Sequence, residues 1–326
     1  MNQKLSQTDS QALYFVKAIA IFSVIAAHSS VIDTTTEVST TITSLWDLFS
    51  CLSIGAFLIT GGILYSRAPG DSARFWKHKC RTLVLPWVFC SLLTYTYRAL
   101  CGHGFRVQEY LLWMLGQGSW YYYATVYLIF LAIFKPIRQR PAALWGCVAV
   151  NALVLTGRAV GIDPFAALPI SEYLNPLNWF GFFALGILLR RNGRLELNRP
   201  KVLGCIFVFL LAFAVVLRFG IFTYFHIANA VYAVFGFFVL FILGRRAAAS
   251  RLAPFFREMG STTYCVYLLH MPIVQAISRK VPVTLFHHLF IPVICTAAML
   301  LLVRIGKWIT DRMPFGKIIR SLVGLR

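Results

Sequence analysis

The sequence predicts an all-α integral membrane protein, a polytopic bundle of about ten transmembrane helices with both termini in the cytoplasm. Hydrophobic residues make up 59% of the 326 residues and charged residues only 13%, whereas a soluble domain usually carries about 25% charged residues. The apolar residues gather in blocks of roughly 17–25 residues, the length that crosses a bilayer core of about 30 Å. The basic residues gather between alternate blocks, which is typical of a multi-pass topology.

Ten blocks have the length and composition of a span. They cover residues 12–31, 44–65, 82–100, 119–135, 142–160, 173–189, 202–219, 224–243, 261–278 and 284–306. In the sixth block, Asn175, Pro176 and Asn178 interrupt the start. We therefore expect a cytoplasmic N-terminal segment at 1–11, one membrane domain at 12–310 and a basic cytoplasmic tail at 311–326.

The distribution of positive charge predicts the orientation. Of the 31 Lys and Arg residues, 23 lie before the first block or after the second, fourth, sixth, eighth and tenth. Six lie in the opposite connections, namely Arg98, Arg106, Arg158, Arg218, Arg279 and Lys280. Because loops rich in Lys and Arg stay in the cytoplasm, both termini are expected there. The net charge of +20 is then explained by topology, and no nucleic-acid partner is expected.

The eight cysteines indicate neither a disulfide framework nor a metal site. They lie mostly in apolar segments, and no CxxC pair or Cys/His cluster at zinc spacing is present. We therefore expect free thiols, no metal and no bound cofactor.

The first block carries two ionisable residues on one helix face. Within "FVKAIAIFSVIAAHSS" (15–30), Lys17 and His28 are eleven residues apart, which places them within about 20° of one face and roughly 16 Å apart along the axis. Ionisable groups in spans usually face the bundle interior or a water-filled cavity, and a neutral imidazole can act as a general base. The alternatives are a snorkelling Lys17 and a hydrogen-bonded or interfacial His28.

A basic residue, ten intervening residues and a histidine in the first span resemble the signature of the acyltransferase 3 family, with Lys17 in place of the usual Arg. Further segments resemble the family in order along the chain. They are "AFLITGGILYS", with Gly62 in place of Tyr; "FWKHKCRTLVLPW", with Lys79, Arg81 and Pro86; "SWYYYATVYLIFLAIFKP"; "FGFFALGILL", with a helix-packing Gly186; and "GSTTYCVYLLHMP", with Tyr267, His270 and Pro272.

The resemblance implies a multi-pass enzyme of the bacterial inner membrane. It would move an acyl group, most often acetyl, from cytoplasmic acyl-coenzyme A to a hydroxyl of a surface polysaccharide or lipid-linked sugar. Acyl-coenzyme A would be the donor substrate, and the other partners would be the sugar acceptor and the lipid bilayer. His28 would deprotonate the acceptor hydroxyl and Lys17 would contact the pantetheine phosphate. Direct transfer and an acyl-histidine intermediate both remain open.

The other candidate residues each carry two interpretations. Lys77, Lys79 and Arg81 are expected to bind the donor phosphates, although topology alone predicts basic residues there. His270, Tyr267 and Trp120 are expected to line the substrate channel, although a helix–helix hydrogen bond or an aromatic belt would use the same residue types. Asp33 and Asp47 are candidates to orient the His28 imidazole, or are solvated loop carboxylates.

Two other functions compete with catalysis. A glycan or glycolipid transporter would use the polar stripe to conduct its substrate, and a structural subunit of an export complex would not need the stripe. No internal repeat is apparent, which counts against a transporter. The Lys17 and His28 spacing counts against a purely structural subunit.

Overall fold

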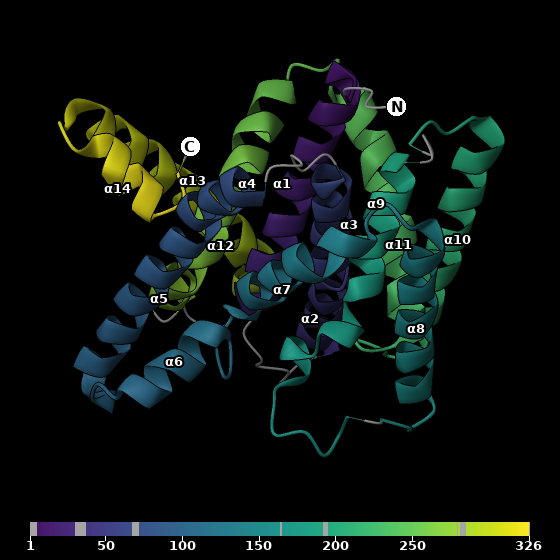
Figure 1. Cartoon of the computed structure of the whole chain (residues 1–326), viewed down its shortest axis with the longest axis horizontal. Helices are drawn as coiled ribbons and strands as arrows, with labels where there is room; N and C mark the ends of the chain where they lie inside the picture. Colours follow the sequence, from purple (N-terminus) through teal and green to yellow (C-terminus); the bar gives the residue numbers. More distant parts are fainter. Residues whose placement is uncertain are drawn as a thin grey trace.

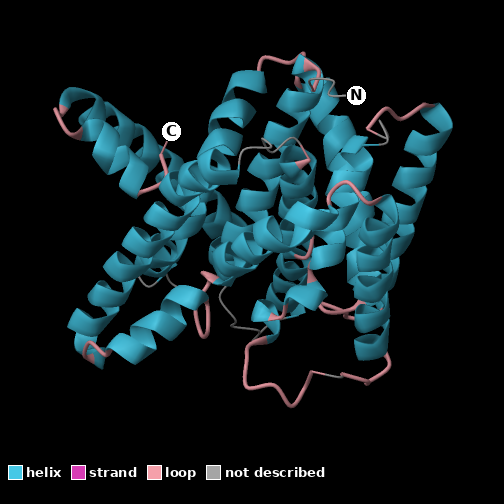
Figure 2. Cartoon of the chain, viewed as in Figure 1, coloured by secondary structure: helices cyan, strands magenta, loops and turns pink. Residues whose placement is uncertain are grey.

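The computed structural model describes residues 5–29, 37–66, 72–163, 165–191, 195–278, 280 and 285–325, and the regular structure of these residues is helical (Figure 2). The helices are α1 (Gln7–Ser29), α2 (Glu37–Ser50), α3 (Ser53–Tyr65), α4 (Ser72–Lys79), the π-helical η1 (Cys80–Val84), α5 (Leu85–Arg98), η2 (Ala99–His103), α6 (Val107–Leu115), α7 (Tyr122–Ile137), α8 (Pro141–Ala159), η3 (Glu172–Leu174), η4 (Pro176–Asn178), α9 (Phe180–Arg191), α10 (Arg199–Arg218), α11 (Ile227–Ala247), α12 (Ala253–Ser278), α13 (Leu285–Arg312) and α14 (Gly316–Leu322).

Within the part of the chain that the structure describes, seven helical stretches are long and apolar enough to cross a membrane. They are Gln7–Ser29, Thr41–Tyr65, Ala73–Gly102, Pro141–Ala159, Arg199–Arg218, Ile227–Ala247 and Leu289–Arg312. Helices α7, α9 and α12 occupy the other three predicted positions. The 12 residues of α9 form about 18 Å of helix, shorter than a bilayer core. The all-helical prediction is confirmed for the described residues, and the count of ten spans stays a prediction.

The predicted helix at 173–189 is wrong at its start. Residues 172–178 form two short 3-10 turns, and α9 begins only at Phe180. Pro176 has no N–H to donate, and two asparagines satisfy the backbone instead. Asn175 Oδ1 accepts from Leu177 N at 3.0 Å, and Asn178 Nδ2 donates to Glu172 O at 2.9 Å. Such local side-chain bonds compete with helix formation.

The predicted span at 44–65 corresponds to the helical stretch Thr41–Tyr65, in which a turn at Cys51 and Leu52 separates α2 from α3. Ser50 and Ser53 flank this break. Each hydroxyl donates to the carbonyl three residues earlier, at 2.6 Å to Asp47 and 2.7 Å to Ser50. Serine hydroxyls that bond to nearby carbonyls bend helices.

Helix α1 is central in the bundle and packs against α2, α3, α11, α12 and α13 (Figure 1). Small residues allow the close approach of α12, where Gly260 faces the Tyr14 backbone, and of α11, where Gly244 faces the Ala12 backbone. A helix enclosed in this way can hold ionisable side chains away from lipid. The fold thereby places Lys17 and His28 inside the bundle.

The outer helices carry the lipid-facing surface. On α10, Leu203 and Phe207 are each 67% exposed, and on α8 Leu153 is 70% exposed. Apolar side chains exposed to this extent along whole helices would be unfavourable in water. They are the expected covering of a protein whose solvent is the bilayer.

Pro272 interrupts the hydrogen-bond ladder of α12 and creates an attachment point for α7. Its missing N–H leaves the Leu268 carbonyl without its helical donor. Tyr121 Oη and Trp120 Nε1 lie 3.1 and 3.4 Å from the Leu268 oxygen and donate to it instead. Tyr267 Oη in turn donates to the Trp120 carbonyl at 2.5 Å. These bonds fix Trp120 and Tyr267 beside each other.

We expect Tyr121→Phe to lower the free energy of unfolding by about 1–3 kcal/mol, because buried carbonyls would lose a donor. The phenol is fully buried and also lies 3.1 Å from Cys90 O. Thermal unfolding in detergent measures the change. Tyr97→Phe, at a residue that is 59% exposed, is the matched control. Equal unfolding midpoints for the two variants would contradict this role of Tyr121.

Candidate active site

A cavity of about 170 Å³ lies between α1, α3, α7 and α12, and we call it the inner cavity. Five of the residues predicted from the sequence line it, namely Lys17, His28, Trp120, Tyr267 and His270. Most of the remaining wall is aromatic and aliphatic, with Thr60 and Thr263 as further polar groups. The structure therefore brings together residues that are up to 253 positions apart, from 17 to 270.

A second cavity of about 940 Å³, the outer cavity, adjoins the inner one at the C-terminal end of α1. Both cavities are lined by Val24, His28, Ile54, Trp120 and Tyr122. The outer cavity has more polar groups in its wall, and these include Asp47, Arg98, Ser119 and Gln275. Arg98 stacks on Trp113, with its guanidinium 4.9 Å from the ring centroid.

His28 lies where the two cavities meet. Its side chain is exposed although it belongs to a central helix, and since it lines both cavities, its accessible surface faces them. Lys17 is half-buried on the same stripe, with its Nζ 4.4 Å from the Tyr14 ring centroid. The two residues lie about 16 Å apart along α1. The stripe predicted from the sequence is thus a cavity wall.

His270 lies beside His28, with the two ring centroids 5.2 Å apart. It is fully buried, and its Nδ1 lies 2.7 Å from the Tyr267 carbonyl oxygen. A carbonyl can only accept, so Nδ1 carries a proton, and Nε2 of a neutral ring keeps its lone pair. Within the described residues Nε2 has no hydrogen-bond partner. The helix–helix hydrogen bond considered for His270 is thus replaced by a bond within α12.

The predicted phosphate-binding residues lie outside the inner cavity. Lys77 and Lys79 are on α4, where Lys79 Nζ lies 5.5 Å from the Phe75 ring centroid, and Arg81 is on the π-helical turn η1. Arg81 and Lys77 are exposed. Leu83, on the same turn as Arg81, lines the inner cavity, so this turn borders the site.

Of the two carboxylates considered for orienting His28, the structure describes only that of Asp47. Asp47 lines the outer cavity together with His28. Among the ion pairs that join described residues, none links Asp47 to a histidine. Asp33 lies outside the described residues. The role of either carboxylate stays a prediction.

Sequence reasoning missed several cavity residues other than Tyr123, which belongs to the aromatic run 120–123 that is predicted either to stack on a sugar or to form an interfacial belt. Tyr123 and Tyr127 stack on each other at a centroid distance of 5.9 Å and line the inner cavity, and Thr60, Thr263 and Tyr264 complete its polar and aromatic wall. A helical-wheel signal was present, because Tyr123 and Tyr127 are four residues apart and share a helix face. Thr263, Tyr267 and His270 on α12 also share a helix face, at spacings of four and three residues.

Comparison with known proteins identifies the class of this site. Residues 11–307, nearly the whole chain, match the model of a protein family described as an acyltransferase domain, acyltransferase 3. The chain belongs to the acyltransferase 3 family. No curated protein and no solved structure matches it. This acyltransferase 3 protein is a multi-pass membrane acyltransferase, and its inner and outer cavities meet at His28 on the stripe that also carries Lys17.

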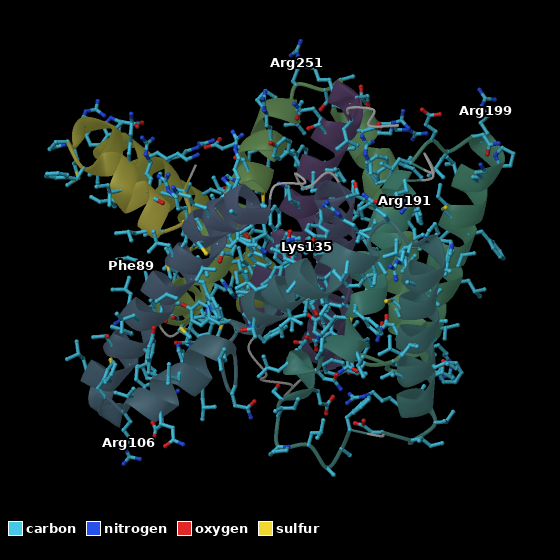
Figure 3. The ribbon with its side chains drawn as sticks, viewed as in Figure 1. Phe89, Arg106, Lys135, Arg191, Arg199 and Arg251 are labelled. Carbon is cyan, nitrogen blue, oxygen red and sulfur yellow. The ribbon has the colours of Figure 1, made fainter. Side chains whose placement is uncertain are left out.

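The connections at the two ends of the acyltransferase 3 bundle differ in charge, since the upper one between α11 and α12, with its flanking helix ends, carries Arg245, Arg246, Arg251 and Arg257, and the lower one between α10 and α11 carries Arg218 at the end of α10. Arg199 and Arg251 point outward at the upper end in Figure 3, and Arg106 points outward at the lower end. The N-terminus also lies at the upper end (Figure 1). We call the upper end the basic end. Lys17 is closer to it than His28, since α1 runs from this end into the bundle.

Proposed function

We propose that the protein transfers an acyl group, specifically acetyl, from acyl-coenzyme A to a hydroxyl of a cell-surface glycan or lipid-linked sugar. The observation that carries this proposal is that His28 lies at the junction of two cavities of different character. A reaction between a donor from one side of a membrane and an acceptor from the other needs its catalytic group at such a junction. The family supplies the reaction class, which is acyl transfer.

In the proposed reaction His28 is the general base. Its imidazole nitrogen takes the proton of the acceptor hydroxyl while the hydroxyl oxygen attacks the thioester carbonyl carbon. The carbon–sulfur bond then breaks, and the coenzyme A thiolate takes the proton from the imidazolium. The products are an acyl ester and free coenzyme A. His270, 5.2 Å away between ring centroids, lines the path and offers its Nε2 as a further acceptor.

The inner cavity suits the donor arm. It is narrow and mostly apolar, and Lys17 lies toward the basic end, which we assign to the cytoplasm because of the positive-inside rule. An ammonium group can hold a phosphate by charge-assisted hydrogen bonds. Lysine keeps the charge of the family's usual arginine without its planar fork. The chain would then lie in the bacterial inner membrane with both termini inside.

The outer cavity suits a sugar acceptor. Aromatic faces, here Trp113, Trp120 and Tyr122, can stack on the apolar face of a sugar ring. The neighbouring Arg98, Ser119 and Gln275 can bind its hydroxyls. The cavity is also several times larger than the inner one. These features support a glycan or a lipid-linked sugar as acceptor.

Mass spectrometry of surface and lipid-linked glycans tests the proposal. Strains that lack the protein are compared with strains restored by the wild type or by His28→Ala at matched membrane levels. We expect an acyl mass increment with the wild type that is lost in the other two strains. A glycan pattern that is identical in all three strains, with export altered instead, would favour the transporter or export-subunit alternative.

A further inference from the structure

The C-terminal helix forms a basic pocket next to the donor end of the inner cavity. Helix α14 packs against α5 and α13 (Figure 1), and a pocket of about 300 Å³ lies between it and the η1 turn. Three cationic side chains line this pocket, namely Arg81, Lys317 and Arg320. Its described wall contains no carboxylate, and Thr82 and Ser321 add two hydroxyls. Residues 316–325 lie beyond the stretch that matches the family, 11–307.

The C-terminal segment is built into the bundle. Leu325 is 8% exposed and belongs to the same apolar cluster as Ile21, Trp87 and Tyr267. Gly316 lies directly against the Thr310 backbone, where no side chain would fit, so the turn from α13 into α14 is tight. The cations of α14 therefore have a defined position relative to Arg81.

Tyr264 and Leu83 separate the basic pocket from the inner cavity. Both line the inner cavity, and Tyr264 Oη donates to the Leu83 carbonyl at 2.6 Å. On the other side, Leu83 follows Thr82 of the basic pocket, and Gly324 of that pocket faces the Tyr264 ring. A ligand with a polyanionic end and a thin apolar arm could therefore occupy both spaces.

The pocket keeps a net positive charge after the ion pair between Arg320 and Asp311 is counted. Arg320 Nη1 lies 2.7 Å from Asp311 Oδ1, which holds one edge of the guanidinium and leaves its other donors for a ligand. The neighbouring cleft at the basic end is less suited to an anion. It contains Arg257 and Lys307, but the Glu258 carboxylate is also in its wall.

We propose that α14 supplies Lys317 and Arg320 to a phosphate site, shared with Arg81, that binds the nucleotide phosphates of the coenzyme A donor. This inference rests on the proposed function for the identity of the donor. It also changes the sequence-based assignment, because Arg81 joins the C-terminal helix in this site while Lys77 and Lys79 do not line it.

The test measures coenzyme A binding to the purified full-length protein in nanodiscs of neutral lipid. We expect Arg320→Gln and Lys317→Gln each to weaken binding about tenfold, which is the value of one charge-assisted hydrogen bond. Acyl-pantetheine, which lacks the nucleotide and its phosphates, should bind both variants and the wild type equally. Arg312→Gln removes the same charge from a side chain that stacks on Trp308, 3.9 Å from its ring centroid, and should leave coenzyme A binding unchanged.

Two further variants serve as controls. The first distinguishes an effect on coenzyme A binding from an effect on folding, and the second distinguishes the basic pocket from the rival cleft. Asp311→Asn breaks the ion pair but keeps Arg320, so coenzyme A should bind at least as tightly as to the wild type. Lys307→Gln, in the rival cleft, should have no effect. Unchanged coenzyme A binding in Arg320→Gln and Lys317→Gln, or an equal loss in Arg312→Gln, would overturn the inference. The inference would also be overturned if coenzyme A binding did not depend on these residues and anionic lipid bound to them instead. The pocket would then be a site for a lipid headgroup.

Failure of this inference is distinguishable from failure of the proposed function. Arg320-dependent binding of coenzyme A without acyl transfer would contradict the proposed function and leave the phosphate site in place. Acyl transfer that is unaffected by Arg320→Gln would contradict the phosphate site alone. A wild-type protein that does not bind coenzyme A would contradict both.

Discussion

His28→Gln is expected to reduce kcat for acyl transfer about 10²–10⁴-fold, the range that a positioned general base contributes. Glutamine retains a polar side chain that can hydrogen-bond at the cavity junction, but it cannot take the proton of the acceptor hydroxyl. Because His28 lies about 16 Å along α1 from Lys17, coenzyme A binding should stay within about twofold of the wild type. Acyl transfer to the isolated glycan and binding of coenzyme A are measured on the same preparation.

The matched control for His28 is His78→Gln. His78 is an exposed residue of α4 that lines neither cavity, so the substitution removes an imidazole without touching the junction. Its kcat should equal that of the wild type. Full acyl transfer by His28→Gln would rule out a base at this position and favour the channel-lining role that a transporter would require.

The composition of the chain was sufficient to predict its fold class. Apolar blocks of spanning length and alternating basic connections can be read without any tertiary contact. The same local information places Lys17 and His28 on one stripe, because helix periodicity alone determines it. In the structure both residues line the inner cavity, and the role of the stripe in binding acyl-coenzyme A stays a prediction.

The partners of the stripe depend on tertiary packing and could not be predicted in this way. His270 approaches His28 because α12 packs against α1 at Gly260, a contact between residues that are distant in the chain. The outer cavity likewise combines α1 with segments after α5, α6 and α10. The basic residues can be recognised in the sequence, but their roles cannot be told apart there. Topology and phosphate binding favour the same sequence pattern, and only the position of Arg81 against α14 separates it from Lys77.

The break between α2 and α3 shows a third limit. Hydropathy over 44–65 is continuous, so the sequence pattern predicts one helix, yet the structure has a turn at Cys51 and Leu52, beside which the hydroxyls of Ser50 and Ser53 bond to nearby carbonyls. In lipid a freed backbone group must find another partner, and the serines offer that partner locally. Helix α3, which begins directly after this turn, forms one wall of the inner cavity.

Gly62→Tyr is expected to prevent correct folding, although it would restore the residue that is usual in the acyltransferase 3 pattern. Helices α3 and α9 touch at Gly62 and Gly186. A Cβ atom added to either glycine would lie 3.0 Å from the Cα atom of the other. The built Cβ of Gly62 also overlaps the Phe183 carbonyl, and that of Gly186 overlaps the Ile59 carbonyl. Backbone atoms cannot rotate away as a side chain can, so the helices would have to separate. Small residues at such contacts are typical of membrane helix pairs.

Even Gly186→Ala should lower the free energy of unfolding by about 1–3 kcal/mol, the usual effect of overpacking. Monodispersity after solubilisation and the thermal unfolding midpoint measure both variants. Gly146→Ala and Gly204→Ala are the controls, because a Cβ at either helical position meets no atom within 4 Å. These controls should match or exceed the wild-type midpoint, since alanine is the better helix former by about 1 kcal/mol. A well-folded Gly62→Tyr protein would show that α3 and α9 do not meet at this pair. The substitution of glycine for the family's tyrosine would then need a reason other than packing.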